Sequence, residues 1–505
     1  MRLDQRKMGV LLTYVSEAIK ILTTLVYTPV MLRLLGDNEY GLYQTVSSTV
    51  AYLSLLSLGF GSAYVRYHSR YQVKDDNNGI ARLNGMFMLV FCAMSLICLV
   101  AGGVMIGNAR AIFGDKLTGA EVNQSKLLMA VLIISMTITF PNSVFNCYVT
   151  AHERFIFQKL LIVVQNLLNP CLTLPLLLLG YGSVAVVAVS ALLTLVVFVS
   201  NLYYCLKKLG MKFVFRGLEF GLLKEMAAFT FFIFLNQIID QVNWAVDKFL
   251  LVRMIGPAMV TVYSVGAQIN SLYIQMSTAV ASVFVPKVNQ IVASSDDNAA
   301  LTRLMTKVGR IQYLILALIL TGFAFFGRAF IGLWAGAGKG QAYEVALLLM
   351  VPVTVSLVQN MGIEIQRAKN MHRARSVVYA CLALGNVVLS IFLIPKWGCV
   401  GAAAGTAISL VLGNILFMNW YYHKKIGLDM VAFWKEILML LPATVVMCLL
   451  GWVYTFFVTI SSWMMLALSA AGFAVVYVGV MWLLGMNPYE KELVRKMLRR
   501  LPGVK

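Results

Sequence analysis

The fold is decided by two matching stretches of sequence, Leu32-Arg33-Leu34-Leu35-Gly36 and Val252-Arg253-Met254-Ile255-Gly256. Each ends a long apolar segment, and the next apolar segment opens with a similar pair, Leu42-Tyr43 or Val262-Tyr263. The two stretches lie 220 residues apart. Because repeated matches at one spacing indicate an internal repeat, they predict two copies of one helical bundle.

Further matches at nearly the same offset extend the repeat. They are Ala151 and Asn169, which match Ala368 and Asn386, and Asn201–Tyr204, which matches Asn419–Tyr422. We therefore expect an N-terminal lobe of six helices over 1–206, a basic cytoplasmic linker over 207–225, and a C-terminal lobe of six helices over 226–423. The remainder, 424–505, holds two more helices and a basic cytoplasmic tail. Six is an even number, so the lobes form a parallel repeat with one orientation in the membrane.

The composition places these lobes in a bilayer. Of the 505 residues, 60% are hydrophobic and only 12% are charged, about half the charge of a soluble protein. This excludes a water-soluble enzyme, and apolar windows of about 20 residues predict transmembrane helices. The windows are 10–32, 41–65, 83–107, 126–150, 157–179, 183–206, 226–251, 258–285, 308–333, 342–366, 375–394, 399–422, 434–457 and 463–484. The expected fold is an all-α polytopic membrane protein with fourteen transmembrane helices.

The distribution of basic residues predicts the topology. The net charge is +20, with 41 Lys and Arg. Of these, 31 fall in segments on the side of the N-terminus and 8 in segments on the other side. Cytoplasmic loops are enriched in Lys and Arg, so both termini are expected in the cytoplasm. The charge thus reflects topology, and no nucleic-acid partner is expected.

Three segments resemble a known family. Leu34–Gln44 and Ser57–Ala63, followed by Arg66-Tyr67, are similar to motifs of the Wzx-type polysaccharide flippases, as is Asn386–Pro395 with the Gly and Ala residues after it. These flippases belong to the MOP superfamily, together with MATE exporters and lipid II flippases. The resemblance covers residues 1 to about 425.

The resemblance implies a MATE-like fold and a transporter rather than an enzyme. It implies that an undecaprenyl-diphosphate-linked oligosaccharide, a repeat unit of O-antigen, capsule or exopolysaccharide, crosses the bacterial cytoplasmic (inner) membrane. Movement to the outer leaflet would occur by alternating access, coupled to a cation gradient. A polysaccharide polymerase and chain-length machinery are the partners that it suggests.

Polar residues recur on one face of each of three expected helices. The stripes are Thr13, Glu17, Lys20, Thr24 and Thr28; Asn236, Asp240, Asn243 and Asp247; and Ser264, Gln268, Ser271, Gln275 and Thr278. Such faces are costly against lipid. They either hold helices together or line a central cavity, and their place at the start of both lobes favours the cavity.

Ionisable residues within membrane helices are candidates for function. We expect Lys20 to contact the diphosphate, with Glu17 as its partner when the site is empty. The other candidates for substrate binding are Arg66, Gln268, Gln275, Lys248 and Arg253. Lys248 and Arg253 lie near the outer end of their helix, where snorkelling explains them equally well.

The second helix stripe is the expected cation-coupling site. Asp240, with the amides of Asn236 and Asn243, suits Na⁺ through its oxygens or H⁺ through desolvation, and Asp247 is included in the set. No other cofactor and no resident metal are expected.

Two other functions remain open. One is a MATE-like exporter of small organic cations, whose pocket would be anionic and aromatic, against which Lys20 argues. The other is a membrane glycan polymerase or acyltransferase, against which the short external loops argue. The Gly336–Gly340 loop resembles a phosphate-binding loop but has no Ser or Thr after Lys339 and is expected outside.

Overall fold

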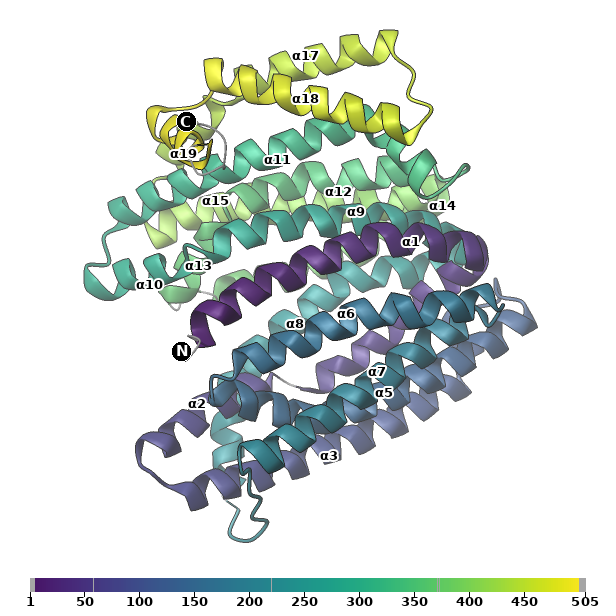
Figure 1. Ribbon diagram of the computed structural model, residues 1–505, viewed down its shortest axis with the longest axis vertical. Helices are drawn as coiled ribbons and strands as arrows, with labels where there is room; N and C mark the ends of the chain where they lie inside the picture. The colour runs from purple at the N-terminus through teal and green to yellow at the C-terminus, as the bar shows by residue number, and fades with distance from the viewer. Residues whose placement is uncertain (1–4, 58, 219, 370, 372, 499–505) are drawn as a thin grey trace. The chain divides into compact units, whose positions relative to one another are not determined.

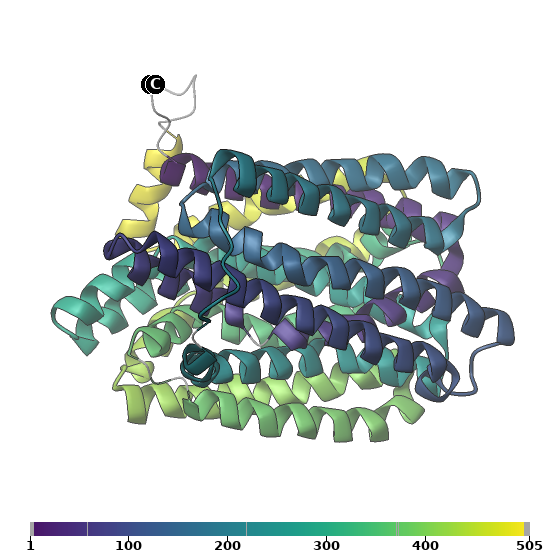
Figure 2. The ribbon, with the colours of Figure 1, turned by 90° about the horizontal axis from the view of Figure 1, so that it is seen from below.

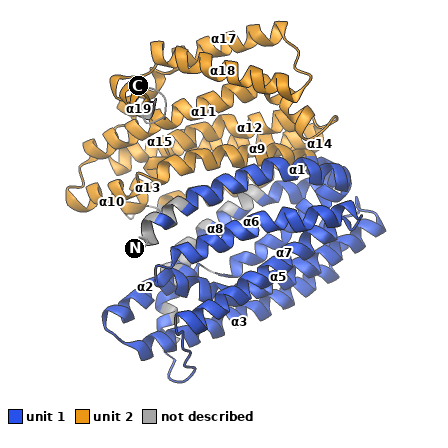
Figure 3. Ribbon diagram, in the orientation of Figure 1, with its two compact units in different colours: residues 1–261 blue, residues 262–505 orange. Residues whose placement is uncertain are grey.

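The computed structural model describes residues 5–57, 59–218, 220–369, 371 and 373–498 (Figure 1). Across these ranges the regular elements are all helices. The chain forms two compact units, residues 1–261 and 262–505 (Figure 3), and each is described here by itself. The all-α fold class expected from the sequence is confirmed for the described residues.

The first unit begins with α1 and ends a few residues into α9. Its elements are α1 (Gln5–Ala51), η1 (Tyr52–Ser57), α2 (Phe60–Val73), α3 (Asn77–Gly107), α4 (Ala109–Phe113), α5 (Gly119–Ala151), α6 (Phe155–Leu178), α7 (Gly182–Tyr203), η2 (Tyr204–Lys208) and α8 (Phe220–Met254). α1 packs on α6, and α5 packs between α3 and α7, so these long helices run side by side (Figure 2).

Two glycines in the Leu34–Gln44 motif shape this unit. α1 turns at Gly36, whose φ is +74°, a value that residues with a side chain rarely adopt. After the turn, α1 passes so close to the start of α9 that a Cβ at Gly41 would overlap the Pro257 carbonyl group. The motif therefore reverses the chain and then lets two helices meet closely.

The expected linker over 207–225 is docked on the first unit. The Val214 amide donates to the Ala81 carbonyl at 3.0 Å, and the Asn84 side chain donates to the Lys212 carbonyl at 2.9 Å. α8, which follows, packs on α1 and α2. The boundary between the compact units consequently falls after Thr261, whereas the lobe boundaries at 206 and 226 remain a prediction.

The second unit contains most of α9 and the rest of the chain. Its elements are α9 (Pro257–Ser282), α10 (Val285–Ser294), α11 (Asn298–Trp334), α12 (Gln341–Val358), α13 (Asn360–Ala368), α14 (Arg373–Leu410), η3 (Val411–Phe417), α15 (Met418–Tyr421), η4 (Tyr422–Ile426), α16 (Met430–Leu438), α17 (Leu441–Phe457), α18 (Trp463–Leu484) and α19 (Pro488–Leu498). α11 packs on α12, α16, α17 and α18. A core of Ala317, Leu440, Ala443, Met447, Tyr477 and Met481 joins the last helices to α11.

The described residues contain 10 stretches long and apolar enough to cross a membrane. Two of them, Leu12–Ser57 and Ala374–Ile426, turn part-way at a glycine of positive φ, Gly36 at +74° and Gly398 at +59°. α8 and α9 are long helices outside this set. The protein is thus a multi-pass membrane protein, and the number of fourteen crossings stays a prediction.

One hydrogen bond recurs between the two units at nearly the offset of the expected repeat, since its asparagines lie 217 residues apart and its hydroxyl residues 216 apart. In the first unit the Asn169 side chain donates to the Ser190 hydroxyl at 3.0 Å. In the second, the Asn386 side chain donates to the Thr406 hydroxyl at 3.2 Å. The internal repeat remains a prediction.

Candidate functional site

Lys20 and Glu17 face one another on α1. Lys20 Nζ lies 4.0 Å from Glu17 Oε2, and their side chains are 51% and 48% exposed. A pair this exposed is screened by solvent and adds little stability. Both charged groups are therefore accessible to a ligand, and substitution of either residue should cost little stability.

Lys248 has a different environment. It lies half-buried on α8, and its Nζ donates to Gln44 Oε1 at 3.1 Å. Gln44 Nε2 in turn donates to the hydroxyl of Tyr40, which is buried. Among the described residues, no carboxylate forms an ion pair with Lys248. A cation held by a neutral amide is stabilised further when an anion reaches it.

Asp247 precedes Lys248 but is buried separately, with 1% of its surface exposed. It interacts electrostatically with the Tyr52 hydroxyl group of η1. Adjacent residues on a helix do not face each other. The Asp247 carboxylate and the Lys248 ammonium group therefore interact with different residues of the first unit.

The two candidate arginines have different surroundings from each other. Arg253 donates to the Ala111 carbonyl at 3.3 Å, and its stem packs beside Gly114, so it holds the α4 segment against the end of α8. Arg66 is exposed on α2. The structure thus gives Arg253 a positioning contact that the sequence did not predict.

The expected coupling residues are only partly described. Asp240, Asn236 and Asn243 lie on α8, but their side chains fall outside the described part of the chain. Of this set, the described side chain is that of Asp247. The coupling role stays a prediction.

Gln268 and Gln275 belong to the second unit, on α9, and both are half-buried. The Gln275 Oε1 atom is buried with no hydrogen-bond partner among the described atoms. The same is true of both amide atoms of Asn270, which is fully buried. Asn270 lies off the predicted Ser264–Thr278 stripe, so helical spacing did not reveal it.

Glu39 belongs to the Leu34–Gln44 motif, and the structure shows contacts of its side chain that the sequence did not predict. Its Oε1 accepts hydrogen bonds from Gln124 Nε2 at 2.6 Å and from the Ser183 amide and hydroxyl groups at 2.6 and 2.7 Å. These contacts fasten the α1 turn to α5 and to the start of α7. Glu39 therefore holds α1, α5 and α7 together at one end of the first unit.

Two histidines form an aromatic cluster in the first unit. The His68 side chain is fully buried, and its ring centroid lies 5.0 Å from that of His152. Its ring also contacts the rings of Tyr64 and Tyr148. Burial lowers the pKa of His68 from its usual 6.5 to about 4, and His152 adds to this effect. The contact between the two histidines is a property of the tertiary structure, since they lie on different helices.

The sequence of the chain matches a known protein family. Residues 7–292 match the polysaccharide biosynthesis protein family, which is more than half of the chain. The chain belongs to this family. This match bears out the resemblance to polysaccharide flippases at the level of the family, and the chain is a multi-pass membrane protein of polysaccharide biosynthesis.

Relatives span nearly the whole chain. The membrane protein EpsK of Bacillus subtilis (strain 168) is 25% identical over 486 residues, which is 94% of each protein. A putative O-antigen transporter of Shigella flexneri is 19% identical and covers 77% of this chain and 91% of its own length. The inward closed lipid II flippase MurJ superposes with a TM-score of 0.74 at 14% identity, over 94% of this chain and 98% of MurJ. That likeness shows a shared fold.

Proposed function

We propose that this family member moves an undecaprenyl-diphosphate-linked oligosaccharide from the cytoplasmic to the outer leaflet of the bacterial cytoplasmic membrane. Family membership supports a polysaccharide precursor as the cargo, and the O-antigen transporter is a relative over most of the chain. Alternating access is the proposed mechanism, in which the site opens to each side in turn. A polymerase then uses the delivered glycan.

The proposal rests on one observation, the environment of the Lys248 ammonium group. A half-buried ammonium group whose described partner is the neutral Gln44 is suited to a phosphate oxygen. Lys20 is the second proposed contact with the diphosphate. Its partial exposure and its weak pair with Glu17 leave it available to a charged ligand.

Coupling to a cation gradient is a further part of the proposal. Asp240, Asn236 and Asn243 are assigned to the ion, with Asp247 as a buried carboxylate on the same helix. An ion that binds one conformation better than the other shifts the equilibrium between them. Asp240→Asn should then remove the dependence of transport on an imposed H⁺ or Na⁺ gradient while the lipid-linked substrate still binds.

Lys248 can be tested with a matched pair of variants. Lys248→Gln keeps a hydrogen-bond donor for Gln44 and removes the charge, whereas Lys248→Arg keeps the charge. In cells that depend on this flippase, we expect Lys248→Gln to lose polysaccharide export and Lys248→Arg to retain part of it, at equal protein levels. Normal export by Lys248→Gln would contradict the anion-binding role.

The buried carboxylate of Asp247 favours one other function, the export of organic cations. Vesicles that contain the purified protein distinguish the two functions. A flippase should accelerate the movement of a fluorescent polyprenyl-diphosphate saccharide and leave ethidium uptake at the level of empty vesicles. The reverse result would establish the exporter.

A further inference from the structure

A pocket lies inside the first unit, where the Ser57–Ala63 motif meets α3, α5 and α8. Its volume is about 350 Å³, near the lower end of the range of about 300–1,000 Å³ for small-molecule sites. A pocket of this size has room for one six-membered ring. Its lining includes Ser57, Gly61, Phe91, Ser143, Asn146 and Gln237.

The pocket offers hydrogen-bonding groups that the protein itself does not use. Gln237 Oε1 is buried and has no hydrogen-bond partner among the described atoms, which is unfavourable unless a ligand supplies one. Asn146 Oδ1 accepts from Asn201 Nδ2 at 3.3 Å, which leaves the Asn146 amide nitrogen available as a donor. The Ser143 hydroxyl donates to the Thr139 carbonyl at 3.0 Å, so its oxygen can still accept. A ligand that both donates and accepts would satisfy all three side chains.

The chemistry of the lining suits a neutral sugar. The part of it that the structure describes carries no charged side chain, and Phe91 adds an apolar wall to the amide and hydroxyl groups. Each hydroxyl group of a sugar donates one hydrogen bond and accepts others, as these groups require. A uronic acid would bring a carboxylate beside a described lining that offers no cation, and burial of an unpaired charge is costly.

Two glycines of the Ser57–Ala63 motif keep the pocket open. Gly59 joins η1 to α2 with a φ of +70°, a value that favours glycine. A Cβ at Gly61 would lie 3.3 Å from Cys147 Sγ, which also lines the pocket. A longer side chain at Gly61 would therefore occupy the space of a ligand.

The pocket lies on the same face of α8 as Lys248. Gln237 and Lys248 are 11 residues apart, which is about three turns of an α-helix and a rise of about 16 Å. Over this distance α8 follows α1, because Lys248 donates to Gln44 Oε1 and the Gln241 side chain donates to the Ser48 carbonyl at 3.5 Å. A glycan whose diphosphate binds Lys248 can therefore place one of its sugars in the pocket.

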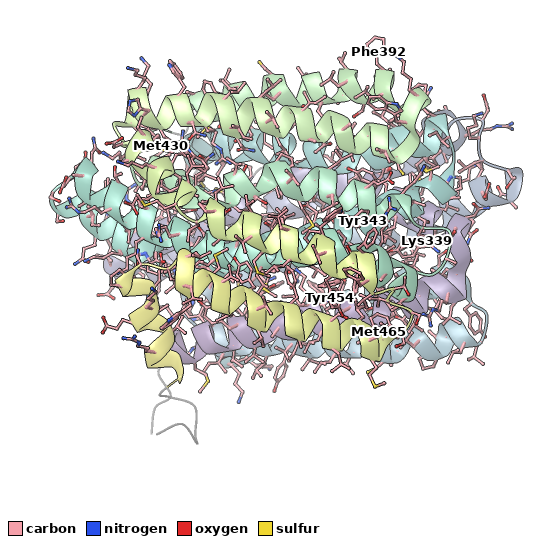
Figure 4. The ribbon with its side chains drawn as sticks, turned by 90° about the horizontal axis from the view of Figure 1, so that it is seen from above. Lys339, Tyr343, Phe392, Met430, Tyr454 and Met465 are labelled. Atoms are coloured by element: carbon pink, nitrogen blue, oxygen red, sulfur yellow. The ribbon has the colours of Figure 1, made fainter. Side chains whose placement is uncertain are left out.

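The predicted topology places the pocket toward the cytoplasm. α5 ends at Ala151, five residues after Asn146, a rise of about 8 Å, and this end of α5 is predicted to be cytoplasmic. In the second unit, Lys339 is predicted to be external and Met430 cytoplasmic, and Figure 4 shows them at opposite ends of the helices. The pocket thus lies toward the side from which the proposed cargo would be loaded.

We propose that this pocket binds one neutral sugar ring of the transported glycan. The hydroxyl groups of the ring bond to Ser143, Asn146 and Gln237, and its C–H groups contact Phe91. This assignment rests on the proposed flippase function and adds to it a requirement for an uncharged sugar at one position of the glycan.

The test is photo-labelling of the full-length protein in phospholipid nanodiscs, since maltoside detergents carry sugar head groups of their own. The probes are the glucoside, galactoside, N-acetylglucosaminide and glucuronide of one diazirine-bearing alcohol. Mass spectrometry should locate adducts of at least one neutral probe on 57–61 and 143–147, at about fivefold or more above the glucuronide, the effect of about one net hydrogen bond. Equal labelling by the glucuronide, or labelling of these segments by none of the neutral probes, would overturn the proposal.

Variants of the lining test the same site. Gln237→Leu keeps the size of the side chain and should lower labelling by the neutral probe about fivefold. Its thermal midpoint should not fall, because Gln237 Oε1 has no partner to lose. Gly61→Leu should fill the pocket and abolish labelling, whereas Gly103→Leu should not, since nothing lies within 4 Å of a Cβ at Gly103. Unchanged labelling of both Gln237→Leu and Gly61→Leu would refute the site.

Transport measurements separate this proposal from the flippase function. In vesicles that contain the purified protein, Gln237→Leu should slow the movement of a fluorescent polyprenyl-diphosphate saccharide built from neutral sugars. Transport by this variant at the rate of the parent protein would show that the pocket is no cargo site and would leave the flippase function intact. Absence of transport by the parent would refute the flippase function, while the labelling would still decide whether the pocket binds a neutral sugar.

Discussion

The guanidinium group of Arg310 is buried against the carboxylate of Glu490. Arg310 Nε donates to Glu490 Oε1 at 2.6 Å, and a second nitrogen donates to Oε2 at 3.1 Å. Arg310 also donates to the carbonyl groups of Glu436 and Gly485 at 2.6 and 3.0 Å. Glu490 simultaneously accepts from the Asn487 amide at the start of α19. One arginine of α11 thereby joins α16 and the C-terminal helix.

Arg310→Met should destabilise the second unit strongly. It leaves Glu490 buried at 3% exposure without its cation, and breaking a buried pair costs about 3–5 kcal/mol. We expect a lower midpoint of thermal unfolding in detergent and faster proteolysis after α18. Arg367→Met removes an exposed pair with Glu364 and is the control, with an expected cost of about 0–1 kcal/mol. Equal effects of the two substitutions would contradict the role of Arg310.

Gly41→Ala should damage the first unit because the added methyl group overlaps the Pro257 carbonyl group. Overpacking of this kind costs about 1–3 kcal/mol. Gly103→Ala is the control, since nothing lies within 4 Å of its Cβ position, and alanine favours a helix over glycine. Thermal unfolding of the purified variants should show a loss for Gly41→Ala alone. A stable Gly41→Ala protein would mean that α1 and α9 do not meet as closely as described.

Acid should destabilise the protein partly through His68. The pKa of His68 is lowered to about 4 in the folded protein, so between pH 6.5 and about 4 the unfolded chain binds a proton that the folded chain does not. Stability is therefore lost as the pH falls through this range. His68→Phe keeps an aromatic ring beside Tyr64, Tyr148 and His152 and should lose less stability between pH 7.5 and pH 5 than the parent protein. Identical losses in the two proteins would exclude His68 as a source.

Lys20→Ala should abolish glycan export with little effect on stability. The Lys20–Glu17 pair is about half exposed, so its loss should cost about 0–1 kcal/mol. Export is measured in cells, and protein amount and thermal midpoint are measured in parallel. Glu17→Gln removes the other half of the pair and is expected to retain export. Loss of the protein itself would instead indicate that Lys20 holds helices together.

The topology predicts which cysteines can be labelled from outside. A cysteine at Lys116, which is exposed on the loop before α5, should react with an impermeant maleimide in intact cells. Cysteines at the exposed positions Lys212 and Arg303 should react only after the membrane is permeabilised. The variants are compared with the parent protein, which has eight cysteines of its own. Labelling of Lys212→Cys in intact cells would invert or break the predicted topology.

The sequence by itself determined that this is an all-α membrane protein of the polysaccharide flippase family. Each membrane helix satisfies its own backbone hydrogen bonds in lipid, so it can be predicted from its own segment of sequence. The length of each apolar segment and the number of Lys and Arg residues beside it are therefore enough to predict the helices and their topology. The break between the apolar windows 10–32 and 41–65, where Gly36 lies, is also visible in the sequence. So is the polar face that carries Lys20 and Glu17, because both residues lie on one helix.

Only the tertiary structure decided which residues meet. Arg310 and Glu490 are 180 residues apart, and Lys248 and Gln44 are 204 apart. Helical periodicity reports the face of one helix and carries no information on the helix that packs against it. The burial of Arg310 and the contacts of Glu39 both depend on such packing, since burial and charge compensation are properties of several elements together.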